Sequence, residues 1–104
     1  MATLRIAFFC WESLYSVRVG GLAMAATNLA ESLVKEKHEV HFFTPGLKNQ
    51  KKNTEKNGVF YHRCYPSGSN IVEYCKSMSL QMVEDYLREE KKERFDALHF
   101  HDWH

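Results

Sequence analysis

The chain has 104 residues, of which 44% are hydrophobic and 26% are charged, and its formal net charge is +1 at pH 7. This length allows at most one small domain with a single core, because a chain of this size buries only about 60 to 70% of the surface that its unfolded form exposes. The balanced charge gives no electrostatic basis for binding nucleic acid or an anionic membrane, so neither is expected as a partner.

The first half of the chain shows a strand pattern, a helix pattern and a second strand pattern. Residues 4–10 are nearly continuous in apolar side chains, which is typical of a parallel strand covered on both faces. From residue 21 onward, apolar residues recur at steps of four, three and four, which predicts an amphipathic helix. These residues are Leu22, Ala26, Leu29 and Leu33. Residues 40–44 predict a short strand that ends before Pro45-Gly46.

The second half repeats this alternation after a polar segment. Residues 47–57 are rich in Lys and Asn and are interpreted as a linker, and residues 59–65 predict a third strand. A helical period runs from about residue 71 to about residue 90, and residues 95–100 predict a fourth strand. The order strand, helix, strand, strand, helix, strand predicts an α/β fold with a mostly parallel sheet, because right-handed crossovers through helices join parallel neighbours.

The cysteines and the N-terminal segment indicate a cytoplasmic protein. Cys10, Cys64 and Cys75 are odd in number and stand in apolar stretches, which suits reduced, buried thiols better than a secreted disulfide framework. The apolar run at residues 6–10 is too short for the core of a signal peptide and far too short to span a bilayer.

A candidate anion site follows the first predicted strand. Gly20 and Gly21 let the backbone approach a ligand, and free amides at the start of a helix favour a phosphate. Arg18 adds a forked cationic donor, so the segment predicts a pocket for a sugar-nucleotide diphosphate; the alternative is a simple tight turn beside a solvated arginine. The sequence has no Gly-x-Gly-x-x-Gly after the first strand and no Gly-Lys-Ser/Thr, which argues against a dinucleotide or P-loop site.

Imidazoles gather after the fourth predicted strand, at His99, His101 and His104 with Asp102. A metal site is disfavoured here, because on an extended segment Asp102 points away from the face shared by His99 and His101. We expect His99 to be a buried, hydrogen-bonded core residue and His101, at the strand terminus, to donate a hydrogen bond to a sugar hydroxyl or phosphate. The other histidines are expected to be ordinary strand or surface residues, and they are His38, His41 and His62.

Two distant segments carry a family resemblance. The first is Glu12 followed by Arg18-Val19-Gly20-Gly21-Leu22, and the second is His99-Phe100-His101-Asp102-Trp103-His104. In this order they resemble the glycogen/starch synthase family, especially its archaeal members, which have Lys-x-Gly-Gly-Leu at the first helix and His-x-His-Asp-Trp-His after a later strand. Lys37-His38-Glu39-Val40 is similar to the family's Gly-His-Glu-Val entry into the second strand. The resemblance covers essentially the whole chain.

The resemblance implies that residues 1–104 are part of the N-terminal Rossmann-like domain of a GT-B enzyme, a retaining glucosyltransferase. Such enzymes transfer glucose from ADP-glucose or UDP-glucose to the non-reducing end of an α-1,4-glucan, with no metal and no other cofactor. Arg18 is then implied to contact the donor phosphates, with Gly20 and Gly21 beneath the diphosphate. Glu12 is implied to lie near the acceptor, and His101 is implied to be catalytic, beside the transferred glucose. The C-terminal donor-binding domain is expected as a partner, and the chain alone is expected to be inactive.

Three positions depart from the family pattern. Arg18 replaces Lys, Met24 replaces an acidic residue, and Lys37 replaces a helix-ending Gly, so Lys37 is expected in a left-handed conformation. The loss of a carboxylate at Met24 favours an alternative function, a non-catalytic Rossmann-like binding or regulatory module. A third alternative is an interaction protein whose last strand, at residues 95–100, pairs with another chain.

Overall fold

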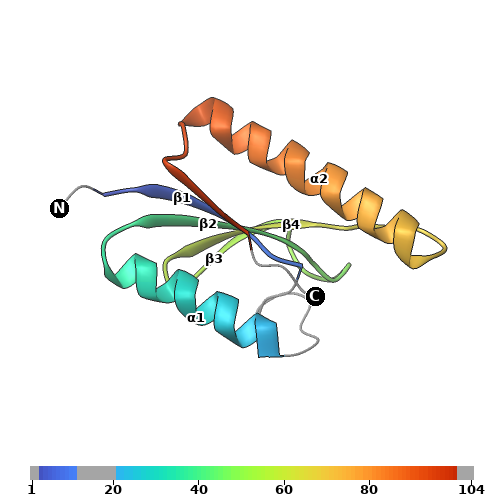
Figure 1. Cartoon of the computed structure of the whole chain (residues 1–104), viewed down its shortest axis with the longest axis horizontal. Coiled ribbons are helices and arrows are strands. Elements are labelled where there is room, and N and C mark those ends of the chain that lie inside the picture. Colours follow the sequence, from blue (N-terminus) through green and yellow to red (C-terminus); the bar gives the residue numbers. More distant parts are fainter. Residues whose placement is uncertain (1–2, 12–20, 101–104) are drawn as a thin grey trace.

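The computed structural model describes residues 3–11 and 21–100, which form one five-stranded sheet with a helix on each face (Figure 1). In chain order the elements are β1 (Arg5–Phe9), α1 (Gly21–Lys35), β2 (Glu39–Pro45), β3 (Asn53–Lys56), β4 (Val59–Cys64), α2 (Ile71–Lys92) and β5 (Ala97–Phe100). The strands lie in the order β3-β4-β2-β1-β5, and only β3 runs antiparallel to its neighbour. The predicted α/β class with a mostly parallel sheet is confirmed. The helices of the described chain lack the length of apolar sequence that crossing a membrane requires.

One strand was missed by the sequence analysis. The interpretation of residues 47–57 as a linker is wrong at its end, because Asn53–Lys56 forms β3 and pairs with β4. This edge strand has no buried side chain, so no hydrophobic alternation marks it. The usable signal was the pair Asn57-Gly58, whose φ angles of 53° and 85° are those of a two-residue hairpin turn.

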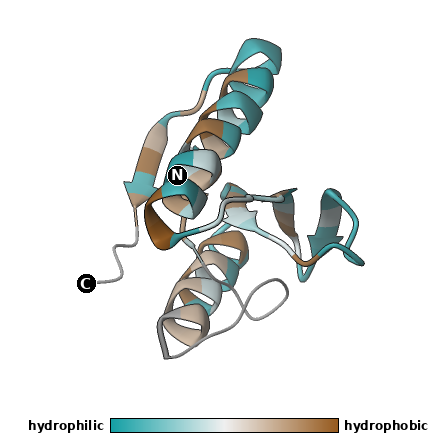
Figure 2. Cartoon of the chain, turned by 90° about the vertical axis from the view of Figure 1, so that its right-hand side faces the viewer, coloured by the Kyte–Doolittle hydropathy of each residue, from teal (hydrophilic) through white to brown (hydrophobic). Residues whose placement is uncertain are grey.

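Each face of the sheet has its own apolar core, and Figure 2 shows the two helices on opposite sides of the strands. Alternate residues of a strand point to opposite faces, so the continuous apolar runs of β1 and β2 supply both cores. The core under α1 contains Ile6, Phe8, Cys10, Ala26, Ala30, Val40, Phe42, Val59 and Tyr61. The core under α2 contains Ala7, Phe43, Cys64, Met82 and Phe95.

Helix α1 lies close to the sheet because its buried side chains are small. Ala23, Ala26 and Ala30 are fully buried. Leu29, which the periodicity placed on the buried face, is 39% exposed. The reason is geometric: Leu29 is next to Ala30 in sequence and therefore about 100° around the helix axis from it.

Helix α1 ends in a hydrogen-bonded cap centred on Lys37. The N–H of Lys37 donates to the carbonyl of Val34 at 2.9 Å, and the N–H of His38 donates to the carbonyl of Leu33 at 3.1 Å. These are the two bonds of a Schellman motif, which requires a left-handed residue. Lys37 has φ 75°, so its predicted left-handed conformation is confirmed.

We expect Lys37→Gly to stabilise the fold by about 1 kcal/mol, because a side chain in the left-handed region costs roughly that amount. Thermal and urea unfolding followed by circular dichroism would measure the gain. Lys35→Gly is the matched control. Lys35 is the last residue of α1, and because a glycine in a helix costs about 1 kcal/mol, this variant should not gain stability. A lower melting temperature for Lys37→Gly would contradict the assignment.

The three cysteines are free thiols that differ in exposure. Cys10 and Cys64 are buried, as expected, whereas Cys75 is only half-buried on α2. Burial raises the pKa of Cys64 to about 12, so this thiol stays protonated at physiological pH. We expect a thiol-specific alkylating reagent at mildly alkaline pH to label Cys75 well before Cys64, as read by mass spectrometry of the peptides. Equal labelling rates in the folded chain would show that Cys64 is accessible.

Candidate functional site

The carboxyl ends of β1 and β5 lie side by side at one end of the sheet (Figure 1). These strands are parallel neighbours, and Phe9 pairs in register with Phe100. The chain leaves β1 towards residues 12–20 and leaves β5 towards residues 101–104. The two sequence motifs therefore start from adjacent strand ends, which is where open parallel sheets bind their ligands.

Only one predicted site residue falls in the described part of the chain. Gly21 is the first residue of α1, and the first turn of a helix has N–H groups with no partner inside the helix, which suits an anion. Glu12, Arg18, Gly20 and His101 lie outside the described residues. Their roles toward donor and acceptor stay predictions.

Aromatic rings pack where β1 and β5 meet. The ring of Phe9 stacks on Phe43 at 5.2 Å and on Phe100 at 4.7 Å between centroids, and Phe100 is 67% exposed. The ring of His99 lies 4.7 Å from that of Phe8. The expectation that His99 is a buried core residue is wrong, because it is only half-buried: β5 is the outermost strand, so one side of it has no neighbouring strand in the described sheet.

An open apolar groove of about 540 Å³ lies between α2 and the ends of β1 and β5. Phe9, Met82, Tyr86, Leu98 and Phe100 are among its lining residues, and no charged side chain lines it in the described part of the chain. Among the described residues, such a surface therefore has no cationic side chain for a diphosphate. Its chemistry suits packing against further polypeptide.

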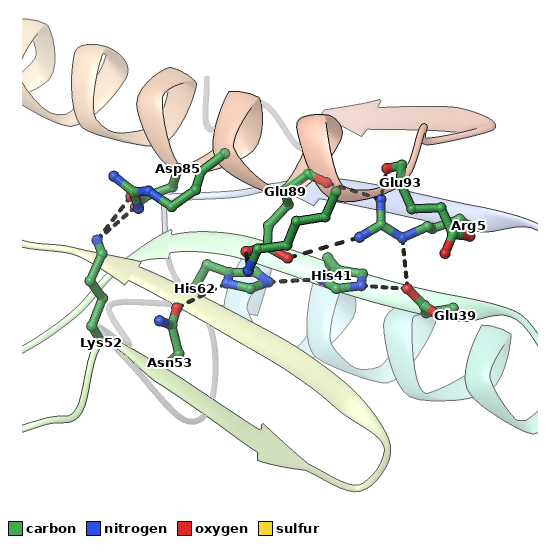
Figure 3. Close-up of polar contacts among 11 residues, drawn as sticks. Arg5, Glu39, His41, Lys52, Asn53, His62, Asp85, Glu89 and Glu93 are labelled. Carbon is green, nitrogen blue, oxygen red and sulfur yellow. Dashed lines mark hydrogen bonds and ion pairs between the residues drawn. The ribbon is translucent and has the colours of Figure 1, made fainter.

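A chain of polar side chains crosses the α2 face of the sheet (Figure 3). Arg5 Nε donates to Glu39 Oε2 at 2.7 Å, and His41 Nε2 lies 2.7 Å from the same oxygen. His41 Nδ1 lies 2.8 Å from His62 Nε2. His62 Nδ1 lies 2.9 Å from Asn53 Oδ1. Side chains from four strands are thus joined in one line.

The sequence analysis did not anticipate this cluster. His41 and His62 were expected to be ordinary strand or surface residues; both do lie in strands, but they are buried and their rings are in contact. His62 pairs in register with Phe43, and His41, two residues before Phe43, points to the same face. The usable signal was that both histidines stand within strands covered on both faces, where an imidazole must find a polar partner.

Burial sets the charges in this cluster. It lowers the pKa of His41, and burial together with the neighbouring His41 lowers the pKa of His62 to about 4. Burial alone raises the pKa of Glu39, but hydrogen bonds from His41 and Arg5 outweigh it, and the net pKa is lowered. At neutral pH the two imidazoles are therefore neutral and Glu39 is ionised.

A buried carboxylate, Asp85, connects α2 to the start of the β3–β4 hairpin. Lys52 Nζ lies 2.9 Å from its Oδ1, and Arg88 Nη1 lies 3.1 Å from the same oxygen. Lys52 also donates to the carbonyl of Arg63 at 3.0 Å. These contacts connect secondary structure elements, so their role is structural.

An open, mostly parallel sheet with a helix on each face is the architecture of the N-terminal domain of GT-B glycosyltransferases. The fold matches sucrose-phosphate synthase from Thermosynechococcus elongatus with a TM-score of 0.72 and 18% identity, over 93% of this chain and 27% of that chain. Residues 19–104 match the model of Glycosyltransferase Family 4. The chain belongs to this family.

A sequence relative agrees with this assignment. The chain is 35% identical over 102 residues to an uncharacterized glycosyltransferase of Methanocaldococcus jannaschii, covering 96% of this chain and 25% of the relative. The chain therefore spans about a quarter of the length of the proteins that it matches.

Proposed function

We propose that this chain is the N-terminal part of a retaining glucosyltransferase of the glycogen synthase type. In this proposal, glucose moves from ADP-glucose or UDP-glucose to the non-reducing end of an α-1,4-glucan. The observation that carries the proposal is the adjacency of β1 and β5, because the strand that precedes residues 12–20 and the strand that precedes residues 101–104 are parallel neighbours. Family 4 membership supports a nucleotide-sugar donor in general.

The roles proposed for the site residues come from the family resemblance, and that placement is compatible with them. The donor diphosphate lies over the start of α1, where Gly20 and Gly21 admit it and Arg18 adds positive charge. His101 follows β5 directly and hydrogen-bonds the transferring glucose. Negative charge develops on the leaving diphosphate, so fixed donors aimed at it lower the barrier more than they strengthen ground-state binding.

The proposal requires a second domain. A glycosyl transfer of this kind depends on holding donor and acceptor together between two domains, and positioning supplies much of the rate. The apolar groove beside β5 is a surface that further polypeptide would cover. We therefore expect the 104-residue chain alone to transfer no glucose.

Radiolabelled ADP-glucose and UDP-glucose, with a maltooligosaccharide acceptor, provide the test. Transfer is expected when a donor-binding domain is supplied and not with the chain alone. Transfer by the chain alone would refute the two-domain requirement. Transfer of a different sugar from a wider donor panel would refute the glucosyl assignment and leave the family membership intact.

Substitutions at two histidines separate catalysis from stability in the completed enzyme. We expect His101→Ala to lower kcat by about 100-fold or more with little effect on the melting temperature. His99→Ala should lower the melting temperature with little effect on kcat, because the His99 ring packs on Phe8. Equal, small effects on kcat from both would contradict the role of His101.

A non-catalytic binding or regulatory module is the second candidate function. Met24, exposed in the first turns of α1, stands where related synthases carry an acidic residue. This candidate predicts that the completed protein binds a nucleotide sugar, as measured by calorimetry, but transfers nothing. Met24→Glu would then be the variant in which to look for gained transfer.

A further inference from the structure

The ends of the polar chain across the α2 face fix where two protons lie. Glu39 Oε2 and Asn53 Oδ1 are acceptors, and they face His41 Nε2 at 2.7 Å and His62 Nδ1 at 2.9 Å. In this orientation of the Asn53 amide, each of these two ring nitrogens carries a hydrogen. In neutral imidazoles the other ring nitrogen then has only a lone pair. The nitrogens left over are His41 Nδ1 and His62 Nε2, which lie 2.8 Å apart.

Two lone pairs that face each other at that distance repel when nothing lies between them. A single shared proton would join them, but it would make the buried pair cationic. Burial opposes this, because both rings are shielded from solvent, with His41 5% and His62 8% exposed. A divalent metal ion also brings positive charge, but it forms direct bonds to the neutral ring nitrogens, and a nearby carboxylate offsets part of that charge.

The carboxylate is Glu89, on the turn of α2 that lies over the two histidines (Figure 3). One ligand atom from each of His41, His62 and Glu89 falls within 4.8 Å of the other two. Glu89 is paired with Lys92 at 3.0 Å, and Lys92 is a largely exposed side chain that is able to turn to solvent. Arg5 Nη2 lies 3.9 Å from Glu89 Oε1, and Lys92 contacts the other carboxylate oxygen, Oε2.

We propose that His41, His62 and Glu89 form a binding site for a divalent transition-metal ion of the zinc class, held between β2, β4 and α2. Two imidazoles and one carboxylate form a ligand set that zinc accepts, with a fourth position for water. Zinc–nitrogen bonds of about 2.0 to 2.1 Å place two tetrahedral ligands roughly 3.3 Å apart, so the 2.8 Å gap between the rings opens by about half an ångström. The hard cation Mg²⁺ prefers oxygen ligands and is not expected to bind.

The outer partners of both rings fit the same site. A metal-bound histidine commonly donates its other N–H to a carboxylate or carbonyl oxygen, which fixes the ring and strengthens it as a ligand. Glu39 fills that role for His41, and the amide oxygen of Asn53 fills it for His62. The site lies on the α2 face of the sheet and cross-links two strands to a helix, so its role is structural and separate from the proposed transfer reaction.

The test is a titration of the chelator-treated chain with Zn²⁺, Co²⁺ and Mg²⁺. His101→Gln and His104→Gln are included in every variant, so that the C-terminal imidazoles contribute nothing. We expect one equivalent of Zn²⁺ to bind by calorimetry and to raise the melting temperature. Co²⁺ should give the visible absorption bands of a tetrahedral site, and Mg²⁺ should do neither.

Variants of the ligands and their surroundings assign the site. His62→Gln and Glu89→Gln should abolish saturable Zn²⁺ binding, and His38→Gln, at a histidine outside the cluster, should leave it unchanged. Asn53→Ala changes an exposed strand residue, so it should leave the fold intact and weaken binding by about 10- to 100-fold. Unchanged affinity in His62→Gln and Glu89→Gln would overturn the proposal.

Nitrogen-15 NMR of the imidazoles tests the proposal in the unsubstituted chain, where no ligand variant has to fold. With Zn²⁺ present, hydrogens are expected on His41 Nε2 and His62 Nδ1. The chemical shifts of the other two ring nitrogens, His41 Nδ1 and His62 Nε2, are expected to change on metal binding. A hydrogen found on His41 Nδ1 or His62 Nε2 in the zinc-treated protein would overturn it. So would a metal shift confined to surface histidines.

Discussion

Arg5→Ala is expected to lower the free energy of unfolding by about 2 to 3 kcal/mol, because it removes a buried guanidinium that donates hydrogen bonds to charged and main-chain acceptors. The Arg5 side chain is only 7% exposed, and its Nε lies 2.7 Å from Glu39 Oε2, whose side chain is 41% exposed. Its Nη1 also donates to the main-chain carbonyls of Glu89 and Glu93, where α2 ends. Its guanidinium stacks 4.1 Å above the ring of Phe95. Alanine would leave a carboxylate and the last carbonyls of a helix without their donor.

Urea unfolding followed by circular dichroism measures this loss, with Arg88→Ala as the matched control. Arg88 also pairs with a carboxylate at 3.1 Å, but its side chain is 57% exposed, so its loss should cost no more than about 1 kcal/mol. Arg5→Lys keeps the charge without the planar fork and should fall between the two. Similar small losses for Arg5→Ala and Arg88→Ala would show that the buried network adds little.

The elements of the fold were predictable where burial repeats with a period. Helix α2 is long and strongly periodic, strand β1 is a nearly continuous apolar run, and both were placed to within about two residues. Strand β3 was missed because its stability comes from backbone pairing with β4 at an exposed edge, which leaves no side-chain pattern. The left-handed Lys37 was predictable because a helix end requires a particular backbone conformation.

The parts of the site were less predictable, because they depend on which strands become neighbours. The sequence shows that two motifs follow strands, but only the strand order places β1 beside β5. The pairing of His41 with His62 depends in the same way on β2 lying next to β4 with a particular register. No spacing rule joins two histidines 21 residues apart. Sequence patterns record the face of a strand and not the identity of its neighbour.

Mild acid is expected to destabilise the metal-free chain through His62. Its pKa lies near 6.5 when unfolded and is lowered to about 4 by burial in the fold, so between these values the unfolded state binds a proton that the folded state does not. The associated stability is therefore fully present above about pH 6.5 and is lost as the pH falls to about 4, by roughly 3 kcal/mol. The lowered pKa values of Glu39 and Glu89 add a further loss of the same sign below about pH 4.5.

Urea unfolding at a series of pH values, at constant ionic strength and with EDTA present, measures this dependence. EDTA is required because a bound metal ion competes with protons for the same ring nitrogens. His62→Gln removes the titrating ring, so its unfolding free energy should change less between about pH 6.5 and 4.5 than that of the unsubstituted chain, whatever its value at neutral pH. The buried His41 accounts for the slope that remains, since its pKa is also lowered. A stability that stays flat over this range in the unsubstituted chain would mean that the folded cluster takes up a proton as readily as the unfolded chain, and hence that Glu39 and Glu89 stabilise a cationic imidazole pair more than burial opposes it.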